Sequence, residues 1–426
     1  MKVELQEVNA VKKAVRVEVG PDEVERETRD VLRDYQKKAR LPGFRAGKAP
    51  IELIRTRFGA AVREDVRDRL LSRTFHAAAE QSALRPLGDP AVDELSFDDG
   101  GPLRYRATFE VVPPIVLRAH RGVELRRTRP RLEPVEVERA LEDLRQARAR
   151  LVVDPERVAA AGDVIVADVD GAPREGATPF HRERMPIEVG AAGSLPAFDE
   201  RLVGARAGTE VSFAVDYPPQ HPNRELAGRT VDFRLQVHEV KRRELPALDD
   251  EFARDLGEFA DLAALRERVR EDLQARHERD ETRASREALL DRVLLENPIP
   301  LPDVLVEREI RQRLEDFVRG LILQGIDPEK SEIDWETLRK RHEPIARKSV
   351  HAALILDAVA AEERLAVDGA ALEQRIRDDA RRLGEPPDKL RERLNQRGAL
   401  PALRAQLLRE RALDYLISVA NIHYSE

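Results

Sequence analysis

Apolar residues alternate with polar ones in some stretches of the chain and recur every three or four positions in others. Val15, Val17 and Val19 alternate with polar residues, which predicts a strand with one buried face. Gly20-Pro21-Asp22 follows directly and predicts the start of a helix, because proline and acidic residues are favoured in a first turn. The Pro42-Gly43 pair ends that helical pattern.

The pattern up to residue 113 completes a small α+β domain. Pro50 opens a short helix that we expect to end near Gly59, and a longer helix should follow over residues 62–81. Alternation returns over residues 103–111, which predicts a second strand. We therefore expect residues 1–113 to form an N-terminal domain that carries residues 41–50 in a loop between helices.

A connector and a mostly β middle domain follow. Pro134 opens an amphipathic helix that we expect to end near Val152, with a charged far face typical of a connector over residues 114–153. Over residues 154–243, short apolar runs separated by Gly and Pro clusters predict a compact β domain. These runs are Val164-Ile165-Val166, residues 211–215 and residues 231–237.

The last part of the chain, residues 244–426, has a helical pattern. From Asp249 to the end we expect long, charged helices, broken where glycine and proline cluster. Those breaks fall at residues 297–302, 327–328, 384–387 and 398–401. The predicted fold class is α+β and multidomain: a small α+β domain, a mostly β domain and an extended all-α domain whose helices form arms with apolar stripes.

Composition narrows the functional classes. A length of 426 residues allows about three domains, and 36% charged with only 4% aromatic residues predicts much exposed helical surface. The absence of cysteine excludes disulfides, thiol catalysis and cysteine-ligated metals. A net charge of −7 argues against general nucleic-acid affinity, although a local basic patch can still bind phosphate. No apolar signal core or membrane-spanning stretch is evident, so we expect a soluble cytoplasmic protein.

The loop of residues 41–50 has the most distinctive chemistry. It places Phe44 between turn residues in a stretch from Tyr35 to Ile51 that holds five basic and no acidic residues. One interpretation is a polar connector whose Phe44 folds back onto the core. The other is a docking surface, in which Arg45 and Lys48 meet phosphate or carboxylate and Phe44 fills an apolar pocket.

Sequence motifs for catalysis are missing. Residues 43–48 superficially resemble a phosphate-binding loop, but they are one residue short between the glycines, and Ala49 replaces the hydroxyl that would hold magnesium. The chain has no His-Glu-x-x-His and no Gly-x-Ser-x-Gly motif. We therefore expect no cofactor, no metal and no bond-breaking active site.

The same loop resembles the signature of the bacterial trigger factor family, Gly-Phe-Arg-x-Gly-Lys-x-Pro. Its fixed positions are met by Gly43, Phe44, Arg45, Gly47, Lys48 and Pro50, whereas Ala46 stands where a second basic residue is common. The resemblance extends over the whole chain. It includes the Asn297-Pro-Ile-Pro stretch and the tract of residues 244–252 after the middle domain.

This resemblance implies an ATP-independent chaperone that docks beside the nascent-chain exit of the large ribosomal subunit, on protein and ribosomal RNA. Gly43, Phe44, Arg45 and Lys48 would form the docking site. The helical domain would form a body and two arms that shield unfolded nascent polypeptides, with the connector lying along that body. The family further implies no membrane partner and a weak homodimer when the protein is free.

For the middle domain the resemblance implies a prolyl isomerase of the FK506-binding type. Its pocket would include Leu195, Phe198, His221 and Phe233, with His221 in place of the usual tyrosine. The strand of residues 164–169 lacks the usual aromatic after its aspartate, and Phe180 and Met185 are candidate replacements. Phe198 and Phe233 could instead be ordinary core residues. Two alternative functions remain: a protein that is primarily a prolyl isomerase, and a periplasmic chaperone-isomerase, which the missing signal sequence disfavours.

Overall fold

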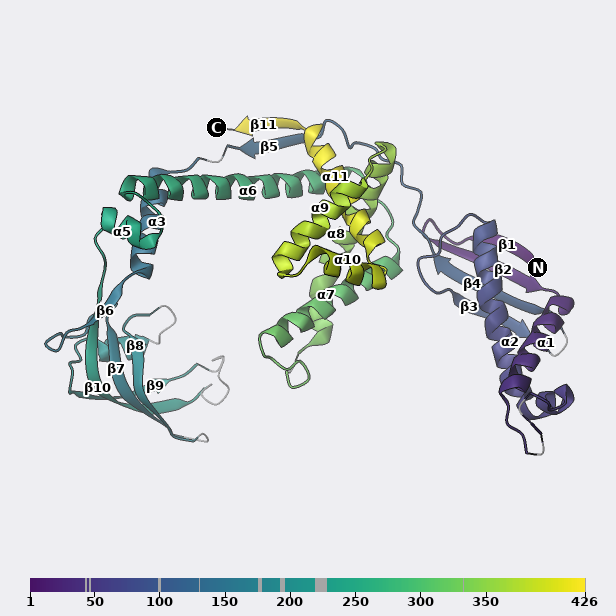
Figure 1. Ribbon diagram of the computed structural model, residues 1–426, viewed down its shortest axis with the longest axis horizontal. Coiled ribbons are helices and arrows are strands. Elements are labelled where there is room, and N and C mark those ends of the chain that lie inside the picture. Colours follow the sequence, from purple (N-terminus) through teal and green to yellow (C-terminus); the bar gives the residue numbers. More distant parts are fainter. Residues whose placement is uncertain are drawn as a thin grey trace. The chain divides into compact units, whose positions relative to one another are not determined.

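The computed structural model describes residues 1–42, 44–45, 47–98, 101–129, 131–174, 178–191, 196–218, 228–331 and 333–425. The chain divides into two compact units, whose helices and strands are labelled in Figure 1. The first unit joins residues 1–128 to residues 283–426, and the second comprises residues 129–282.

The first unit begins with an antiparallel sheet of order β1-β2-β4-β3, packed against two helices. Its elements are β1 (Lys2–Glu7), β2 (Lys12–Val19), α1 (Pro21–Lys38), α2 (Ile51–Gln81), β3 (Ala91–Phe97) and β4 (Leu103–Glu110). The predicted central strands are confirmed, because the inward residues of β2 and β4 are buried beneath the helices. The outer strands β1 and β3 escaped prediction, since they are mostly exposed and lack clear alternation.

The expectation of two helices over residues 51–81 is wrong, because α2 is continuous. Gly59 lies within it, where a glycine costs only about 1 kcal/mol relative to alanine. Ile54, Val62 and Val66 are all buried, so one apolar face runs through the expected break. Burial of that face outweighs the weak local preference of Gly59 against helix.

The second half of the first unit is a helical body that incorporates the segment after β4. Its elements are β5 (Glu124–Thr128), α6 (Leu262–Glu296), α7 (Asp303–Leu323), α8 (Trp335–Glu362), α9 (Gly369–Leu383), α10 (Pro387–Gln396), α11 (Leu400–Ser418) and β11 (Asn421–Ser425). Helix α6 enters this unit with its C-terminal part, which packs on α8 and α11 around Leu289, Ile355 and Leu416. Helices α7 and α8 form one hairpin, and α9 and α10 pack against each other.

The expectation that the chain is helical to its end is wrong for residues 421–425. These residues form β11, which pairs in parallel with β5 so that Ile422 lies opposite Leu125. Leu125 is buried in the core of the helical body, which anchors the strand pair there. The partner strand is remote in sequence, and a five-residue run is too short to reveal its period.

Asn297, at the break between α6 and α7, binds the connector to the helical body. Its side-chain oxygen accepts a 2.7 Å hydrogen bond from the Arg118 backbone N–H, and its amide nitrogen donates to the carbonyls of Ala119 and Val293. His351 Nε2 lies 2.8 Å from the Asn297 carbonyl oxygen. The asparagine is only 3% exposed, so these bonds satisfy polar groups that burial would otherwise penalise.

A second polar junction joins the connector to the end of α8. His120 Nε2 lies 2.9 Å from Glu363 Oε1, and the Arg121 guanidinium donates to both carboxylate oxygens at 2.8 and 2.7 Å. Hydrogen bonds from His120 and then Arg121 lower the pKa of Glu363 from 4.5 to about 2. The carboxylate therefore stays ionised well into acid conditions.

The second unit contains a five-stranded antiparallel sheet and a small helical cluster. Its elements are α3 (Pro134–Ala147), β6 (Arg150–Val153), β7 (Val164–Pro173), β8 (Phe180–Glu188), α4 (Pro196–Leu202), β9 (Glu210–Asp216), β10 (Thr230–Glu244), α5 (Asp250–Leu256) and the start of α6. The strand order is β6-β10-β7-β8, and β9 pairs with the first part of β10. Helix α3 packs on α5 and α6 through Val137, Phe252 and Leu265.

The predicted end of the connector helix near Val152 is wrong. Helix α3 ends at Ala147, and residues 150–153 form β6, which pairs with residues 241–244 of β10. β-branched Val152 and Val153 favour a strand over a helix terminus. The expected strands in the three apolar runs of the middle region are confirmed as parts of β7, β9 and β10. The α+β multidomain fold class is thereby confirmed.

Acid should weaken the junction at Glu363. Because the folded pKa lies below the unfolded one, ionised Glu363 stabilises the fold fully above pH 4.5, and this stabilisation is lost as the pH falls from 4.5 towards 2. We expect Glu363→Gln to lower stability at neutral pH and to flatten this acid loss, as measured by urea unfolding at a series of pH values. Glu329→Gln, at an exposed position between α7 and α8, is the control. An unchanged pH profile in Glu363→Gln would contradict the assignment.

Candidate functional site

The 41–50 loop is held at both ends. Leu41 and Ala49 are buried against the N-terminal core, and Gln36 Nε2 donates a 2.6 Å hydrogen bond to the Ala49 carbonyl. Two tight turns follow within the loop, closed by the Phe44 N–H on Leu41 and the Lys48 N–H on Arg45. Gly47 adopts a φ of +79°, a conformation that favours glycine. The backbone conformation therefore explains why glycine occupies this signature position.

The tip of the loop points its side chains to solvent. Phe44 is 43% exposed, and Arg45 and Lys48 are exposed as well. Phe44 is also absent from the described residues that pack on the N-terminal core. The interpretation in which Phe44 folds back onto that core therefore does not fit the structure. Gly43 and Ala46 lie outside the described residues, and the role of the loop remains a prediction.

Four phenylalanines form an aromatic cluster on one face of the middle sheet. Phe233 of β10 lies opposite Phe213 of β9 on one side and opposite Gly171 of β7 on the other. Phe180 of β8 lies opposite Gly171 in turn. Phe213, Phe233, Gly171 and Phe180 therefore form one row across the sheet. Phe198 of α4 covers the row, with ring centroids 4.9 Å from Phe213 and 4.8 Å from Phe233.

Gly171 is the gap in this row, and Phe180 fills it. A Cβ atom at position 171 would lie 2.2 Å from Phe180 Cζ, so a side chain here would collide with the ring. The Phe180 ring thereby reaches Phe233 across β7, with centroids 6.1 Å apart. Of the two candidate replacements for the missing strand aromatic, Phe180 joins the cluster. Met185 is 44% exposed and does not.

The expected isomerase pocket is thus only partly visible. Phe198 and Phe233 are brought together, whereas Leu195 and His221 lie outside the described residues. Phe213 and Tyr217 were missed: Tyr217 packs against the same core, and its burial raises the pKa of its hydroxyl. The alternation of Val211, Phe213 and Val215 was the available signal for Phe213, but it does not reveal strand register.

The α7–α8 hairpin exposes several large apolar side chains. The exposed fractions are 37% for Phe317, 59% for Ile322, 83% for Leu323, 42% for Ile326 and 43% for Trp335. A hollow of about 430 Å³ on the same hairpin is lined by Glu307, Ile310, Arg311, Leu314, Glu315, Val318 and Arg339. Single exposed apolar residues are common, but a concentration of them on one hairpin is typical of an interaction surface.

Chemistry elsewhere in the described residues is sparse. One group there has the composition of a metal site, His120 with Glu362 and Glu363. Arg121 already binds both carboxylate oxygens of Glu363, which identifies the group as a structural junction. None of the described helices is both long and apolar enough to span a bilayer.

Comparison with known proteins agrees with this architecture. The family described as bacterial trigger factor protein matches residues 1–144, and the family described as its C-terminus matches residues 261–418. Trigger factor of Solibacter usitatus is 31% identical, with 97% of this chain and 98% of the relative covered. Trigger factor of Geobacillus kaustophilus is 30% identical, with 99% and 100% covered.

A solved structure has the same fold over nearly the whole length. It is described as "Promiscuous Substrate Recognition in Folding and Assembly Activities of the Trigger Factor Chaperone". The TM-score is 0.54 at 21% identity, and 98% of this chain and 99% of that chain are covered. The fold and the matches define a multidomain molecular chaperone.

Within that class the chain belongs to the trigger factor family. The resemblance first noted in the 41–50 loop is thereby confirmed, and it extends over nearly the whole chain. Its chaperone function follows from this membership.

Gly171→Ala should destabilise the middle sheet by about 1–3 kcal/mol, because the added methyl forces the Phe180 ring away. Hydrogen exchange of the β7 and β10 amides in the full chain measures this cost locally. In a Phe180→Ala background the same substitution should cost little, since the colliding ring is gone. Equal costs in both backgrounds would contradict the proposed contact.

Proposed function

We propose that this protein is an ATP-independent holding chaperone that docks on the large ribosomal subunit near the nascent-chain exit. It acts in the cytoplasm on unfolded nascent polypeptides and self-associates weakly when free. The observation that carries this proposal is the exposed Phe44-Arg45 tip on a firmly anchored loop in a member of the trigger factor family.

The docking site is proposed to consist of Gly43, Phe44, Arg45 and Lys48. An arginine can form paired hydrogen bonds with a phosphate or carboxylate, and a lysine adds a point charge. Phe44 would fill an apolar pocket and supply most of the affinity, as buried aromatic anchors do. The buried ends of the loop support this role, because a pre-ordered loop loses little conformational entropy on binding.

The holding surface is proposed to include the exposed apolar residues of the α7–α8 hairpin. Each apolar stretch of a client would gain about 25 cal/mol per Å² of buried surface. Several such weak contacts together give avidity and still permit release without a nucleotide. Leu323 and Ile322 are the most exposed large apolar residues of this hairpin, and Trp335 and Phe317 add partly exposed aromatic rings.

The middle domain is proposed to be a prolyl cis–trans isomerase with the aromatic cluster as its pocket. Rotation about a peptide bond faces a barrier of about 18–20 kcal/mol that arises from amide resonance. An apolar pocket favours the twisted amide, because it removes water from the carbonyl. Phe198 and Phe233 would hold the proline ring, and Phe180 would supply the wall that β7 lacks.

Docking is tested by sedimentation with ribosomes. We expect the Phe44→Ala, Arg45→Ala double variant to bind about 30-fold more weakly, because it loses both the aromatic anchor and a charge-assisted contact. A Val8→Ala, Arg16→Ala double variant removes an exposed valine and an exposed arginine from the same domain and should sediment like the wild type. Unchanged co-sedimentation of the loop variant would refute the docking site.

Isomerisation is tested by a protease-coupled assay on a proline peptide with the full chain. We expect Phe198→Ala to lower kcat/KM at least about tenfold, since its ring covers the row of phenylalanines. Suppression of client aggregation should be unchanged in this variant. If the wild type shows no rate above background yet still suppresses aggregation, the isomerase function is rejected, as is the alternative that the protein is primarily an enzyme.

A further inference from the structure

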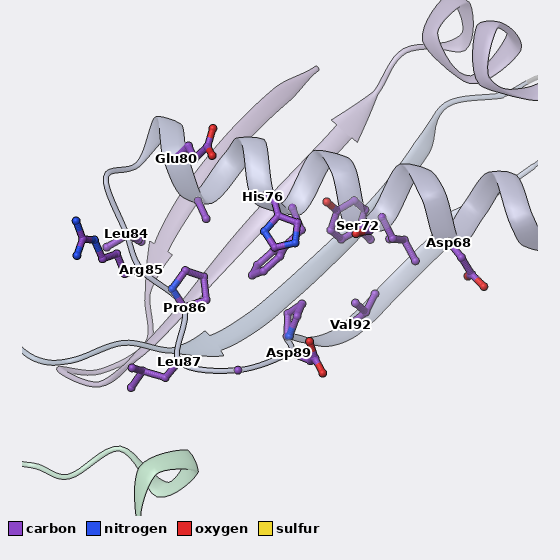
Figure 2. A pocket seen from close by; sticks show the side chains of 16 residues that line it. Asp68, Ser72, His76, Glu80, Leu84, Arg85, Pro86, Leu87, Asp89 and Val92 are labelled. Atoms are coloured by element: carbon purple, nitrogen blue, oxygen red, sulfur yellow. The ribbon is translucent and has the colours of Figure 1, made fainter. Parts of the chain in front are cut away.

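The N-terminal domain carries a groove that the proposed docking loop does not use. It lies between the C-terminal half of α2 and residues 84–92, the segment that leads into β3, and has a volume of about 740 Å³ (Figure 2). Leu71, Phe75 and Leu84 line it, together with Leu87 and Val92. Figure 2 shows Ser72 and His76 on the helix and Asp89 and Val92 on the facing segment. We call this feature the α2–β3 groove.

An open sheet edge runs beside the α2–β3 groove. Strand β3 pairs with β4 and lies at the edge of its sheet in the described part of the chain. Its residues 91–93 pair regularly, before the register shifts between Asp93 and Ser96. An extended peptide can add to such an edge through backbone hydrogen bonds. Alternate side chains of that peptide would then point towards the groove.

The rim of the groove favours a cationic ligand. Asp68, Glu80 and Asp89 contribute carboxylates, whereas Arg85 contributes one guanidinium. A peptide with lysine or arginine on both sides of its apolar residues would complement this rim, and acidic flanks would be repelled. Charge thus selects among the apolar segments that the groove floor could accept.

The groove adjoins the N-terminal part of α7, the helix that also carries part of the proposed holding surface. Arg308 donates a 2.9 Å hydrogen bond to the Leu87 carbonyl, and Gly88 lies against Val304. Positions 304, 308, 311 and 315 follow one face of α7 at helical spacing. Arg311 and Glu315 line the hollow on the α7–α8 hairpin. The groove and the hollow therefore lie along one helix face.

We propose that the α2–β3 groove binds an extended apolar polypeptide segment flanked by lysine or arginine. Such a segment would pair with residues 91–93 and place its apolar side chains over the partly exposed Leu71, Leu84 and Leu87. This proposal rests on the proposed holding function, of which the groove forms an N-terminal extension. The N-terminal domain would then bind clients in the α2–β3 groove, in addition to docking through the 41–50 loop.

The absence of native cysteine makes the groove directly observable in the full chain. An environment-sensitive dye on Ser72→Cys reports from the groove, and the same dye on the exposed residue Ala61→Cys of α2 is the control. The probes are the synthetic peptide Lys-Arg-Leu-Val-Leu-Val-Lys-Arg and its counterpart with Glu-Asp and Glu-Asp flanks. We expect a saturable change at position 72 alone, with the basic peptide bound about tenfold more tightly.

Substitutions on the rim and floor sharpen the test. Glu80→Lys with Asp89→Lys should reverse the preference between the two peptides, because it reverses the rim charge. Val92→Glu should abolish the signal. Val8→Glu should not, at a valine in the β1–β2 connection that is 48% exposed against 40% for Val92. Circular dichroism of each variant verifies that the fold is intact.

Three results would overturn the proposal. The first is a silent dye at position 72, and the second is equal affinity for both peptides. The third is a dye change that depends on protein concentration without peptide, which would assign the groove to a second copy of the chain. If the chain still suppresses client aggregation while the dye is silent, the groove proposal alone fails. Loss of both would refute the holding function itself.

Discussion

The buried amide of Asn297 is the interaction on which the helical body depends. A side chain with both donor and acceptor atoms lies in a nearly solvent-free site, where each unsatisfied polar group would cost about 1–3 kcal/mol. It satisfies the backbone of the connector and the end of α6 at once, and its carbonyl is met by His351. The prolines that follow cannot continue the helix, so α7 must begin anew. The Asn-Pro-Ile-Pro motif therefore forms a structural joint.

The connector extends the contacts at Asn297 to other parts of the helical body. Immediately after the backbone of Arg118 and Ala119 is held by Asn297, Arg121 and His120 meet Glu363. The chain then enters β5, whose partner β11 comes from the C-terminus. Segments that are far apart in the sequence thus converge on the helical body. Such non-local contacts explain why local pattern alone could not predict β11.

Sequence pattern predicted those elements whose burial is one-sided and strong. The alternation of β2 and the amphipathic α1 were visible because each has one buried face. Edge strands β1 and β3 were not, since exposure removes the period. At Gly59, the local signal for a break was real but weak, and the continuous apolar face of α2 overrode it. At Val152, strand pairing with β10 overrode an apparent helix.

The candidate sites differ in the same way. The 41–50 loop could be recognised as a candidate site because its aromatic and basic residues are close together in the sequence. Its exposure follows from the turns within it. Only part of the aromatic cluster could be predicted, because its residues meet through strand register and not through sequence spacing. The residues in this register are Phe180, Gly171, Phe233 and Phe213. Gly171 of β7 makes room for the Phe180 ring of β8 to reach Phe233 of β10. Such an arrangement produces no periodic pattern in the sequence. The family resemblance made Phe180 a candidate replacement, but its place required the pairing of β7 with β8.

Helix α2 links the two proposed functions of the N-terminal domain. The docking loop leads into its first turn, whereas the α2–β3 groove lies along its C-terminal half. With 31 residues, the helix is about 46 Å long, so the two features are separated by a large fraction of that length. A ligand in the groove would therefore not compete sterically with a surface bound at the loop tip. The continuity of α2, which the sequence did not reveal, places the proposed docking loop at one end of one small domain and the proposed peptide groove at the other.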